Sequence, residues 1–448
     1  MYIVPLIMPT RKGSHPMTLS PESNELYTRV LHEELLAAMG CTEPIAIAYA
    51  ASLLRSVLGH TPERIEAELS GNIIKNVKSV IVPATGGLHG IEAAIAAGIV
   101  ANAPGRKLEV LSGLTSASHA RIKALVQDCP MRISEMESEY PFDLLLVGYA
   151  DGHTARVRIS ERHTNVVLLE KDGCSCIDMA ENHRCNDGVS EITEGDRADR
   201  SLMNVKDIVT FAESTPLDEL RPLLLRQIDM NMAIAKEGLC GDYGASIGKV
   251  IYRNGEASLK DKARAYAAAG SDARMSGCEL PVCIISGSGN QGITASVPVV
   301  VYAKELGYPE DELLRALIVA DLITIHQKTQ IGCLSAYCGA ISAGCGAGTG
   351  ICFLLGGRYY EIAHTLVNAL AILSGTICDG AKPSCAAKIA MAVEAGILGY
   401  DMMKSGKQFY GGDGIITKGV ENTIRNVGKL AKDGMSETDK EIIRIMLS

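Results

Sequence analysis

The sequence predicts an α+β protein, with a predominantly helical body that carries an inserted α+β lobe. Of the 448 residues, 47% are hydrophobic but only 4% are aromatic, with no Trp and 45 Gly. Such a composition favours a core of small aliphatic side chains in close-packed helices over an aromatic-rich sandwich. Alternation with a period of two, which indicates strands, is confined to the stretch between about Thr61 and Arg200.

The length of the chain predicts more than one substructure, because a single hydrophobic core stops growing at about 250–300 residues. Residues 1–60 are expected to form an N-terminal extension and helices of the helical body. Residues 61–200 are expected to form the inserted lobe, and residues 201–448 the helical part that holds the candidate metal ligands. The active site is expected between the body and the lobe.

Helix signals begin at Ser20 and continue to His60. Ser20 followed by Pro21 is a helix start, and apolar residues recur behind it at helical spacing. Gly40 is expected to interrupt the helix, which leaves Cys41 near a turn and Pro44 at the first position of the next helix.

The predicted lobe contains short strands and two helices. The strands are expected at Leu108 to Leu111, Asp143 to Gly148, Ala155 to Ile159 and Asn165 to Glu170, and the helices at Gly87 to Val100 and Thr115 to Gln127.

The chain is predicted to be helical again from Val205 to its end, with glycine-rich joints. Residues 329–357 contain no charge and could span a bilayer by length alone. Glycine, serine and threonine recur within this stretch, so a buried helix pair is favoured over a membrane span.

Three cysteines near the C-terminal end, Cys338, Cys378 and Cys385, are the candidate metal ligands. Lys382-Pro383 breaks helical repetition between the last two, so their thiols are free to converge on one centre. Cysteine thiolates are the standard ligands of iron–sulfur clusters, and three of them leave one iron open as a Lewis acid. The alternative is that these cysteines are small apolar core residues.

The run Ser286-Gly287-Ser288-Gly289-Asn290-Gln291-Gly292 is a candidate substrate-binding turn. It fits G-x-G-x-x-G after the strand-like segment Val282 to Ile285, but the acidic strand end of a dinucleotide fold does not follow. Glycines at a helix start let backbone N–H groups approach an anion such as a carboxylate. Thr85-Gly86-Gly87 is a second candidate turn of this kind. A packing turn is the alternative for both.

Three motifs occur in a fixed order: Gly40-Cys41-Thr42-Glu43-Pro44, the glycine-rich run, and the cysteine trio with intervals of 40 and 7 residues. Between about Leu31 and Gly414 the chain therefore resembles the L-cysteine desulfidase family, a branch of the iron–sulfur-dependent serine dehydratase alpha-chain superfamily. The resemblance implies a 4Fe-4S cluster on the three cysteines. It also implies conversion of L-cysteine to hydrogen sulfide, pyruvate and ammonia without pyridoxal phosphate.

Cys41 is the candidate catalytic base, or a transient fourth cluster ligand, because the resemblance places its motif at the active site. A thiol beside a helix N-terminus is expected to have a lowered pKa. Glu43 is the rival base, and a purely structural Cys41 is the third alternative.

Other cysteines are candidates for different roles. Cys345 and Cys352 follow Cys338 at intervals of seven residues and are expected to be core residues on one helix face. Cys174, Cys176, His183 and Cys185 together could hold zinc, although exposed loop residues are the simpler interpretation.

The expected activity is that of a carbon–sulfur lyase acting on a small amino acid. An iron–sulfur L-serine dehydratase and a non-catalytic iron–sulfur binding protein remain alternatives; the regulatory domain of bacterial L-serine dehydratases is not recognisable, which favours the desulfidase. A pyridoxal-phosphate lyase would leave the cysteine trio without a role.

The charge pattern limits the expected partners and location. A formal charge of −9 gives no basic surface for nucleic acid. No membrane association is expected, and the basic residues Arg11 and Lys12 follow the N-terminal apolar run instead of preceding it, unlike in a signal peptide. Fourteen cysteines in such a chain fit the cytoplasm, and a homo-oligomer is compatible with the sequence.

Overall fold

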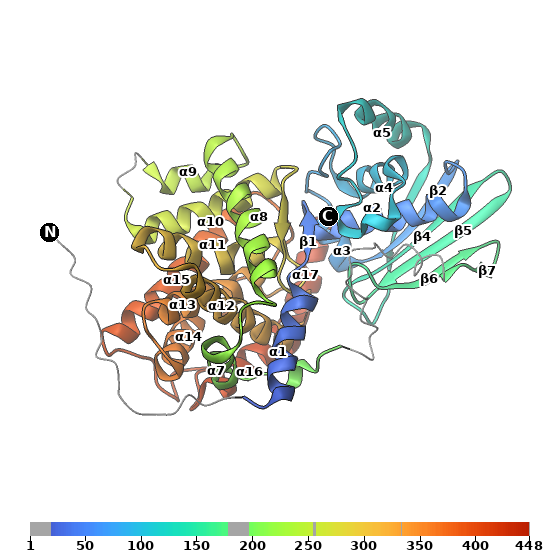
Figure 1. Ribbon diagram of the computed structural model, residues 1–448. Helices are drawn as coiled ribbons and strands as arrows, with labels where there is room; N and C mark the ends of the chain where they lie inside the picture. The colour runs from blue at the N-terminus through green and yellow to red at the C-terminus, as the bar shows by residue number, and fades with distance from the viewer. Residues whose placement is uncertain (1–18, 178–196, 254–256, 333, 448) are drawn as a thin grey trace.

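The α+β class predicted from the sequence is confirmed. The computed structural model describes residues 19–177, 197–253, 257–332 and 334–447. Within them, helices form most of the chain, and the strands form one six-stranded and one two-stranded sheet. A helical body and a lobe that carries the larger sheet lie side by side (Figure 1).

The sheet of the lobe is mixed, with strand order β3-β2-β4-β5-β6-β7. β2 and β3 are parallel, and the other neighbours are antiparallel. Helix α2 packs on β4 and β5, α4 packs on α2, and α5 packs on α4. Gly148 of β4 lies directly under Leu54 of α2, where any Cβ would come within 2.6 Å of a leucine methyl group. The strands are β2 (Arg64–Ser70), β3 (Met131–Met136), β4 (Asp143–Ala150), β5 (His153–Ser160), β6 (Val166–Lys171) and β7 (Cys174–Ser175), and the helices are α2 (Thr42–Leu58), α3 (Gly71–Val77), α4 (Gly90–Ala101) and α5 (Ser116–Asp128).

Most predicted elements of the lobe are present, but one is wrong, and four observed elements, β2, β3, α3 and β7, were not predicted. The segment expected as a strand at Leu108 to Leu111 is a 3-10 helix over Pro104–Glu109, followed by a turn. Leu108 and Leu111 are buried. The apolar run therefore correctly indicates residues of the core, but it does not distinguish a strand from a short helix. β2 and β3 were not predicted: β3 is only half-buried, and β2 is interrupted by Glu66 and Glu68.

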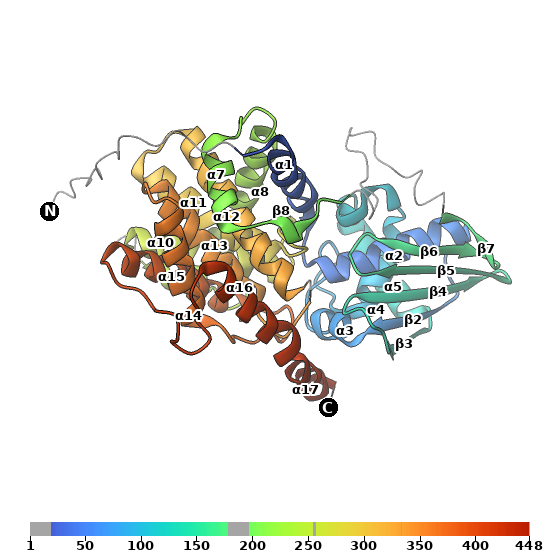
Figure 2. The same ribbon diagram turned by 90° about the horizontal axis from the view of Figure 1, so that it is seen from below.

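The helical body is arranged around α13, which contacts four neighbouring helices, α11, α12, α14 and α15. The body comprises α1 (Pro21–Glu34), α7 (Val205–Ser214), α8 (Arg221–Cys240), α9 (Ile247–Ile251), α10 (Leu259–Met275), α11 (Gly289–Leu306), α12 (Glu310–Ile331), α13 (Gly339–Leu354), α14 (Tyr359–Leu373), α15 (Cys385–Lys404), α16 (Val420–Lys429) and α17 (Ser436–Leu447). The final helix, α17, extends away from the rest of the body (Figure 2). It contacts α3 of the lobe.

Glycines let α13 and α15 pack almost backbone to backbone. A Cβ on Gly344 would lie 2.3 Å from the carbonyl oxygen of Ala392, and a Cβ on Gly348 would lie 2.3 Å from that of Gly396. Both pairs have the same offset of 48 residues, so the two helices run parallel and begin at the same end of the body. The uncharged stretch was expected to form a buried helix pair, but it contains one buried helix, α13, and only the last residues of α12. Its glycines serve close packing against α15. Among the described residues, no helix is both long and apolar enough to cross a membrane.

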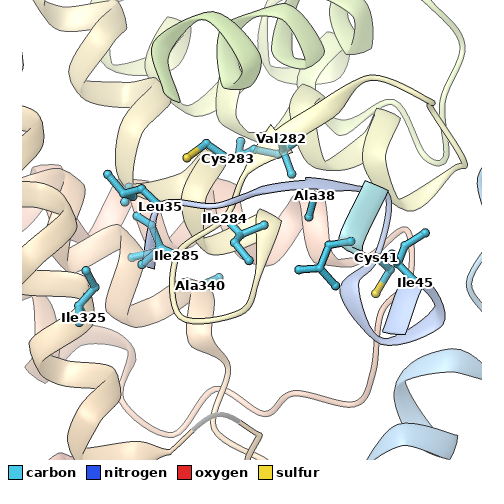
Figure 3. Close-up of a cluster of buried hydrophobic side chains, with 14 of the residues drawn as sticks. Leu35, Ala38, Cys41, Ile45, Val282, Cys283, Ile284, Ile285, Ile325 and Ala340 are labelled. Atoms are coloured by element: carbon cyan, nitrogen blue, oxygen red, sulfur yellow. The ribbon is translucent and has the colours of Figure 1, made fainter. Parts of the chain in front are cut away.

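A two-stranded sheet joins the first motif to the glycine-rich run. β1 (Ala37–Met39) pairs antiparallel with β8 (Pro281–Cys283), with Ala38 opposite Val282. Gly40 follows β1 with φ +63°, and a side chain there would collide with the ring of Pro83. Figure 3 shows Cys41 just beyond this pairing, next to Ile45. The helix predicted to continue to Gly40 ends earlier, at Glu34, because Ala37–Met39 pair with β8. Gly40 does lie in the turn before the next helix, which begins at Thr42, two residues before Pro44.

The limits of independently folding units stay a prediction. α2 belongs to the segment assigned to the body but packs on the sheet of the lobe, and α17 contacts α3.

Asp321 is a fully buried carboxyl in α12 that should make stability depend on pH. Oδ1 accepts a hydrogen bond from Gln227 Nε2 at 3.0 Å, and Oδ2 has no partner among the described residues. Burial raises the pKa of Asp321 to about 7, against the effect of the Gln227 hydrogen bond. The unfolded-state pKa is about 3.9, so ionisation costs the folded state stability as the pH rises from about 4 to about 7.

We expect Asp321→Asn to remove the cost of ionising this buried carboxyl. The free energy of unfolding at pH 8 should therefore rise by roughly 2–4 kcal/mol, because each unit of pKa shift corresponds to about 1.4 kcal/mol. Urea unfolding of both proteins at pH 5 and pH 8 measures it. An equal difference between the two proteins at both pH values would contradict the assignment.

Candidate active site

One cavity at the junction of lobe and body collects most of the predicted site residues. It is lined by Cys41 and Glu43 at the start of α2, by Ser288, Asn290 and Gln291 around the start of α11, and by Cys338, Cys378 and Cys385. Its volume is about 110 Å³. These residues come from segments up to 344 positions apart in the sequence, so the fold has brought three separate motifs to one place.

Cys338 and Cys378 are held together by backbone hydrogen bonds. The Cys338 N–H donates to the carbonyl of Thr376 at 2.9 Å, and the Cys378 N–H donates to the carbonyl of Ala336 at 2.6 Å. Tyr337 and Ile377 form an antiparallel bridge between them. The two cysteines therefore lie on neighbouring extended segments at the cavity wall.

Cys385 joins them because α13 and α15 are parallel. Cys338 is the N-cap of α13 and Cys385 is the first residue of α15. The 48-residue offset places Cys338 level with Ala386, the neighbour of Cys385. Both thiols thus sit at helix N-termini, where unpaired N–H groups and the helix dipole favour negative charge.

The loop between Cys378 and Cys385 is fixed by ion pairs and by one glycine. Asp379 pairs with Lys382 and with Lys388, whose Nζ lies 2.5 Å from its carboxylate. Gly380 has φ +94°, and a Cβ there would lie 2.5 Å from the carbonyl oxygen of Lys75. The loop is therefore anchored to both α15 and α3 before any ligand binds.

The cysteine trio has the donor chemistry of an iron–sulfur site, because thiolates are the ligands that such clusters use. Within the part of the chain that the structure describes, no three His, Cys, Asp or Glu side chains lie close enough together to share one ion. Burial, with a smaller effect from the neighbouring Cys378, raises the pKa of Cys338 to about 12. A bound cation would hold this thiol as a thiolate.

Cys41 and Glu43, which also line the cavity, form a hydrogen-bonded pair. The Cys41 thiol donates to Oε2 of Glu43 at 3.1 Å, and Thr42 donates to the same oxygen at 3.0 Å. Asn76 Nδ2 donates to Oε1 at 3.0 Å. All four residues are buried. The three donors describe an ionised carboxylate beside a neutral thiol.

The predicted lowering of the Cys41 pKa is wrong. Burial, followed by the charge of Glu43, raises the pKa of Cys41 well above its usual value, while Arg274 acts in the opposite direction. The pKa of Glu43 is lowered: burial opposes ionisation, but His163, the Cys41 hydrogen bond and Arg274 outweigh it. The helix N-terminus is present at Cys41, but complete burial beside a carboxylate has the larger effect.

The glycine-rich run forms the start of α11, as predicted, but only part of it faces the cavity. Among its residues, Ser288, Asn290 and Gln291 line the cavity, whereas Ser286, Gly287 and Gly289 form the turn behind it. The Ser286 N–H already donates to Glu34 at 2.9 Å, and the Ser288 N–H to the Ile285 carbonyl at 3.0 Å.

Thr85, the other predicted substrate-binding residue, does not line this cavity. Its hydroxyl donates to the carbonyl of Val82 at 2.7 Å and accepts from the N–H of Leu88, so it closes its own turn.

Four residues of the site have no signal in the sequence motifs. Lys75, Asn76 and Arg274 line the cavity. His163, between β5 and β6, packs on Phe142 and beside Gly287, and burial lowers its pKa although the charge of Glu43 opposes this. None of the four belongs to a recognisable sequence motif. Only the three-dimensional arrangement shows that they converge.

The remaining cysteine predictions have mixed outcomes. Cys345 and Cys352 are buried in α13, which confirms the core assignment. Cys174 is exposed on β7 and Cys176 follows it. His183 and Cys185 lie outside the described residues, so a zinc site there stays a prediction.

The family model described as the serine dehydratase alpha chain matches residues 105–444, and the chain belongs to this family. This confirms the superfamily indicated by the sequence motifs.

Among particular relatives, a UPF0597 protein of Desulfitobacterium hafniense is 53% identical over 424 residues, covering 95% of this chain and 97% of the relative. UPF0597 proteins of Treponema denticola (42% over 438 residues; 96% and 100%) and Finegoldia magna (46% over 423 residues; 94% and 99%) are also similar over nearly their whole length.

Proposed function

We propose that this chain is an L-cysteine desulfidase, a lyase that holds a 4Fe-4S cluster on Cys338, Cys378 and Cys385. The observation that carries the proposal is the convergence of these thiols, the Cys41–Glu43 pair and the start of α11 on one buried cavity. When bound, the cluster would supply an open iron, a Lewis acid with affinity for a thiolate leaving group.

The cavity residues would position the substrate and move its α-proton. The N–H groups of Asn290 and Gln291 in the first turn of α11, two residues that line the cavity, have no partner within the helix and suit a carboxylate. Cys41 would pass its proton to Glu43 and then, as a thiolate, take the proton from the α-carbon. The electron pair left on the α-carbon forms the double bond as the Cβ–S bond breaks. Sulfide leaves, and the remaining aminoacrylate hydrolyses to pyruvate and ammonia.

L-serine dehydratase is the second candidate, favoured by the family match itself. The chemistry is the same except for the leaving group. Expulsion of hydroxide needs more assistance than expulsion of a thiolate, because the conjugate acid of hydroxide has a pKa near 15.7. A soft thiolate is also the better match for iron, so we favour cysteine.

Steady-state kinetics under anaerobic conditions tests the substrate. We expect a higher kcat/KM for L-cysteine than for L-serine, with sulfide and pyruvate released in equal amounts. Turnover of L-serine with no sulfide from L-cysteine would place the chain among the dehydratases. An intact cluster with neither substrate consumed would support the non-catalytic binding protein.

We also propose a cytoplasmic location. Each cysteine that the structure describes is free, as expected in a reducing compartment, which would also preserve an open iron–sulfur centre. A homo-oligomeric state stays a prediction.

A further inference from the structure

Arg274 is a buried cation without a hydrogen-bonding partner for two of its donors. It lies in the last turn of α10, lines the cavity and is only 2% exposed. Among the described residues, neither Nε nor Nη2 has a partner. A buried guanidinium normally pairs with an anion, because removing its charge from water is costly.

The guanidinium lies against the start of α11. A Cβ on Gly289 would lie 2.4 Å from Nε of Arg274 and 2.8 Å from its Cζ. Gly289 thus lets the arginine approach the first turn of an 18-residue helix. A cation beside the positive end of a helix is unfavourable unless an anion lies between them. The two features together form a site for an anion.

Glu43 does not fill this site. The charge of Arg274 contributes to lowering the pKa of Glu43. However, Oε2 of Glu43 already accepts hydrogen bonds from Cys41 and Thr42, and Oε1 accepts one from Asn76. The donors of Arg274 are therefore left for a ligand.

We propose that Arg274 binds the α-carboxylate of the substrate, together with the first N–H groups of α11. The ligand class is α-amino carboxylates, and the inference rests on the proposed function for the identity of the reacting side chain. A planar guanidinium fork can hold a carboxylate through two parallel hydrogen bonds and so fix its orientation. Because Cys41 lines the same cavity, a carboxylate held at Arg274 would present the neighbouring α-carbon toward the Cys41–Glu43 pair.

Equilibrium binding of L-alanine tests this without turnover. L-alanine carries the same α-carboxylate and amine but no leaving group, so its binding is informative even if the chain is not a desulfidase. Calorimetry on the anaerobically purified protein should show L-alanine binding about 10- to 100-fold tighter than L-alaninamide, whose neutral amide replaces the carboxylate.

Arg274→Gln should weaken L-alanine binding by about the same factor and abolish the preference over L-alaninamide. Arg264→Gln is the matched control on the same helix, since Arg264 pairs with Asp261 and Glu394 and does not line the cavity. It should bind L-alanine like the wild type. Iron content and melting temperature report whether each variant has folded. Arg274→Lys, which keeps the charge but not the fork, serves if Arg274→Gln does not fold, and should also bind more weakly.

Unchanged L-alanine binding in a folded Arg274→Gln or Arg274→Lys protein would overturn the proposal. Equal affinity of the wild type for L-alanine and L-alaninamide would overturn it as well. A wild-type protein without desulfidase activity, whose L-alanine binding still depends on Arg274, would instead count against the proposed function and leave the carboxylate-binding role of Arg274 in place.

Discussion

Replacement of Cys378 by alanine should abolish iron loading and, with it, all lyase activity. Cys378 lies on the extended segment paired with that of Cys338, and both line the cavity with Cys385. A cluster held by three thiolates loses one of only three protein ligands in this variant. We expect the same loss for Cys338→Ala and Cys385→Ala, measured as iron and acid-labile sulfide per chain after anaerobic reconstitution.

Cys345→Ala is the matched control for this prediction. Cys345 lies on α13, two turns after Cys338, is 1% exposed and does not line the cavity. Its removal should cost some stability, as loss of a buried side chain does, but leave iron content unchanged. Full iron and sulfide content in Cys378→Ala would show that the trio is not the ligand set.

The second large effect is expected at Cys41. Loss of a positioned general base typically lowers the rate by about 10²- to 10⁴-fold. Cys41→Ala should therefore keep its cluster and still bind L-cysteine, yet exchange the α-proton with solvent deuterium far more slowly. Glu43→Gln should show a similar loss, and the double variant little more, because the two residues act as one unit.

Thr42→Val distinguishes the role of Cys41 as general base from the loss of a hydrogen bond to the Glu43 carboxylate. It removes one hydrogen bond to Glu43 but leaves the Cys41 thiol in place, so a much smaller effect is expected. In the proposed mechanism the thiolate forms by transfer of the Cys41 proton to Glu43, and the raised pKa of Cys41 keeps that one proton on the pair, so the exchange rate should not change with pH across the neutral range. Wild-type exchange in Cys41→Ala would show that Glu43 or another group is the base and that Cys41 only packs.

The fold class and several individual helices, turns and strands could be predicted, because they depend on patterns within short stretches of the sequence. Ser20, which accepts a hydrogen bond from the Ser23 N–H, and Gly40, in the left-handed region, act through their own backbone neighbourhood. The alternation of β5 and β6 likewise reflects local burial. These signals are therefore visible in the sequence alone.

The missing parts depend on contacts between distant segments. β3 forms only because β2 lies beside it in parallel, and neither has a strong pattern of its own. The pKa of Cys41 follows from burial and from Glu43, not from its helix position. Arg274 acquires its importance from Gly289, on a different helix. Periodicity carries no information about such pairings, so these residues could not be assigned from the sequence.

The central claim is that this cavity holds a cluster with one iron open to L-cysteine. Mössbauer spectra of protein reconstituted anaerobically with iron-57, before and after addition of L-cysteine, test it most directly. We predict one iron site distinct from the other three, whose parameters change when L-cysteine is added. Four irons that are indifferent to L-cysteine, or a folded protein that takes up no iron, would contradict the account.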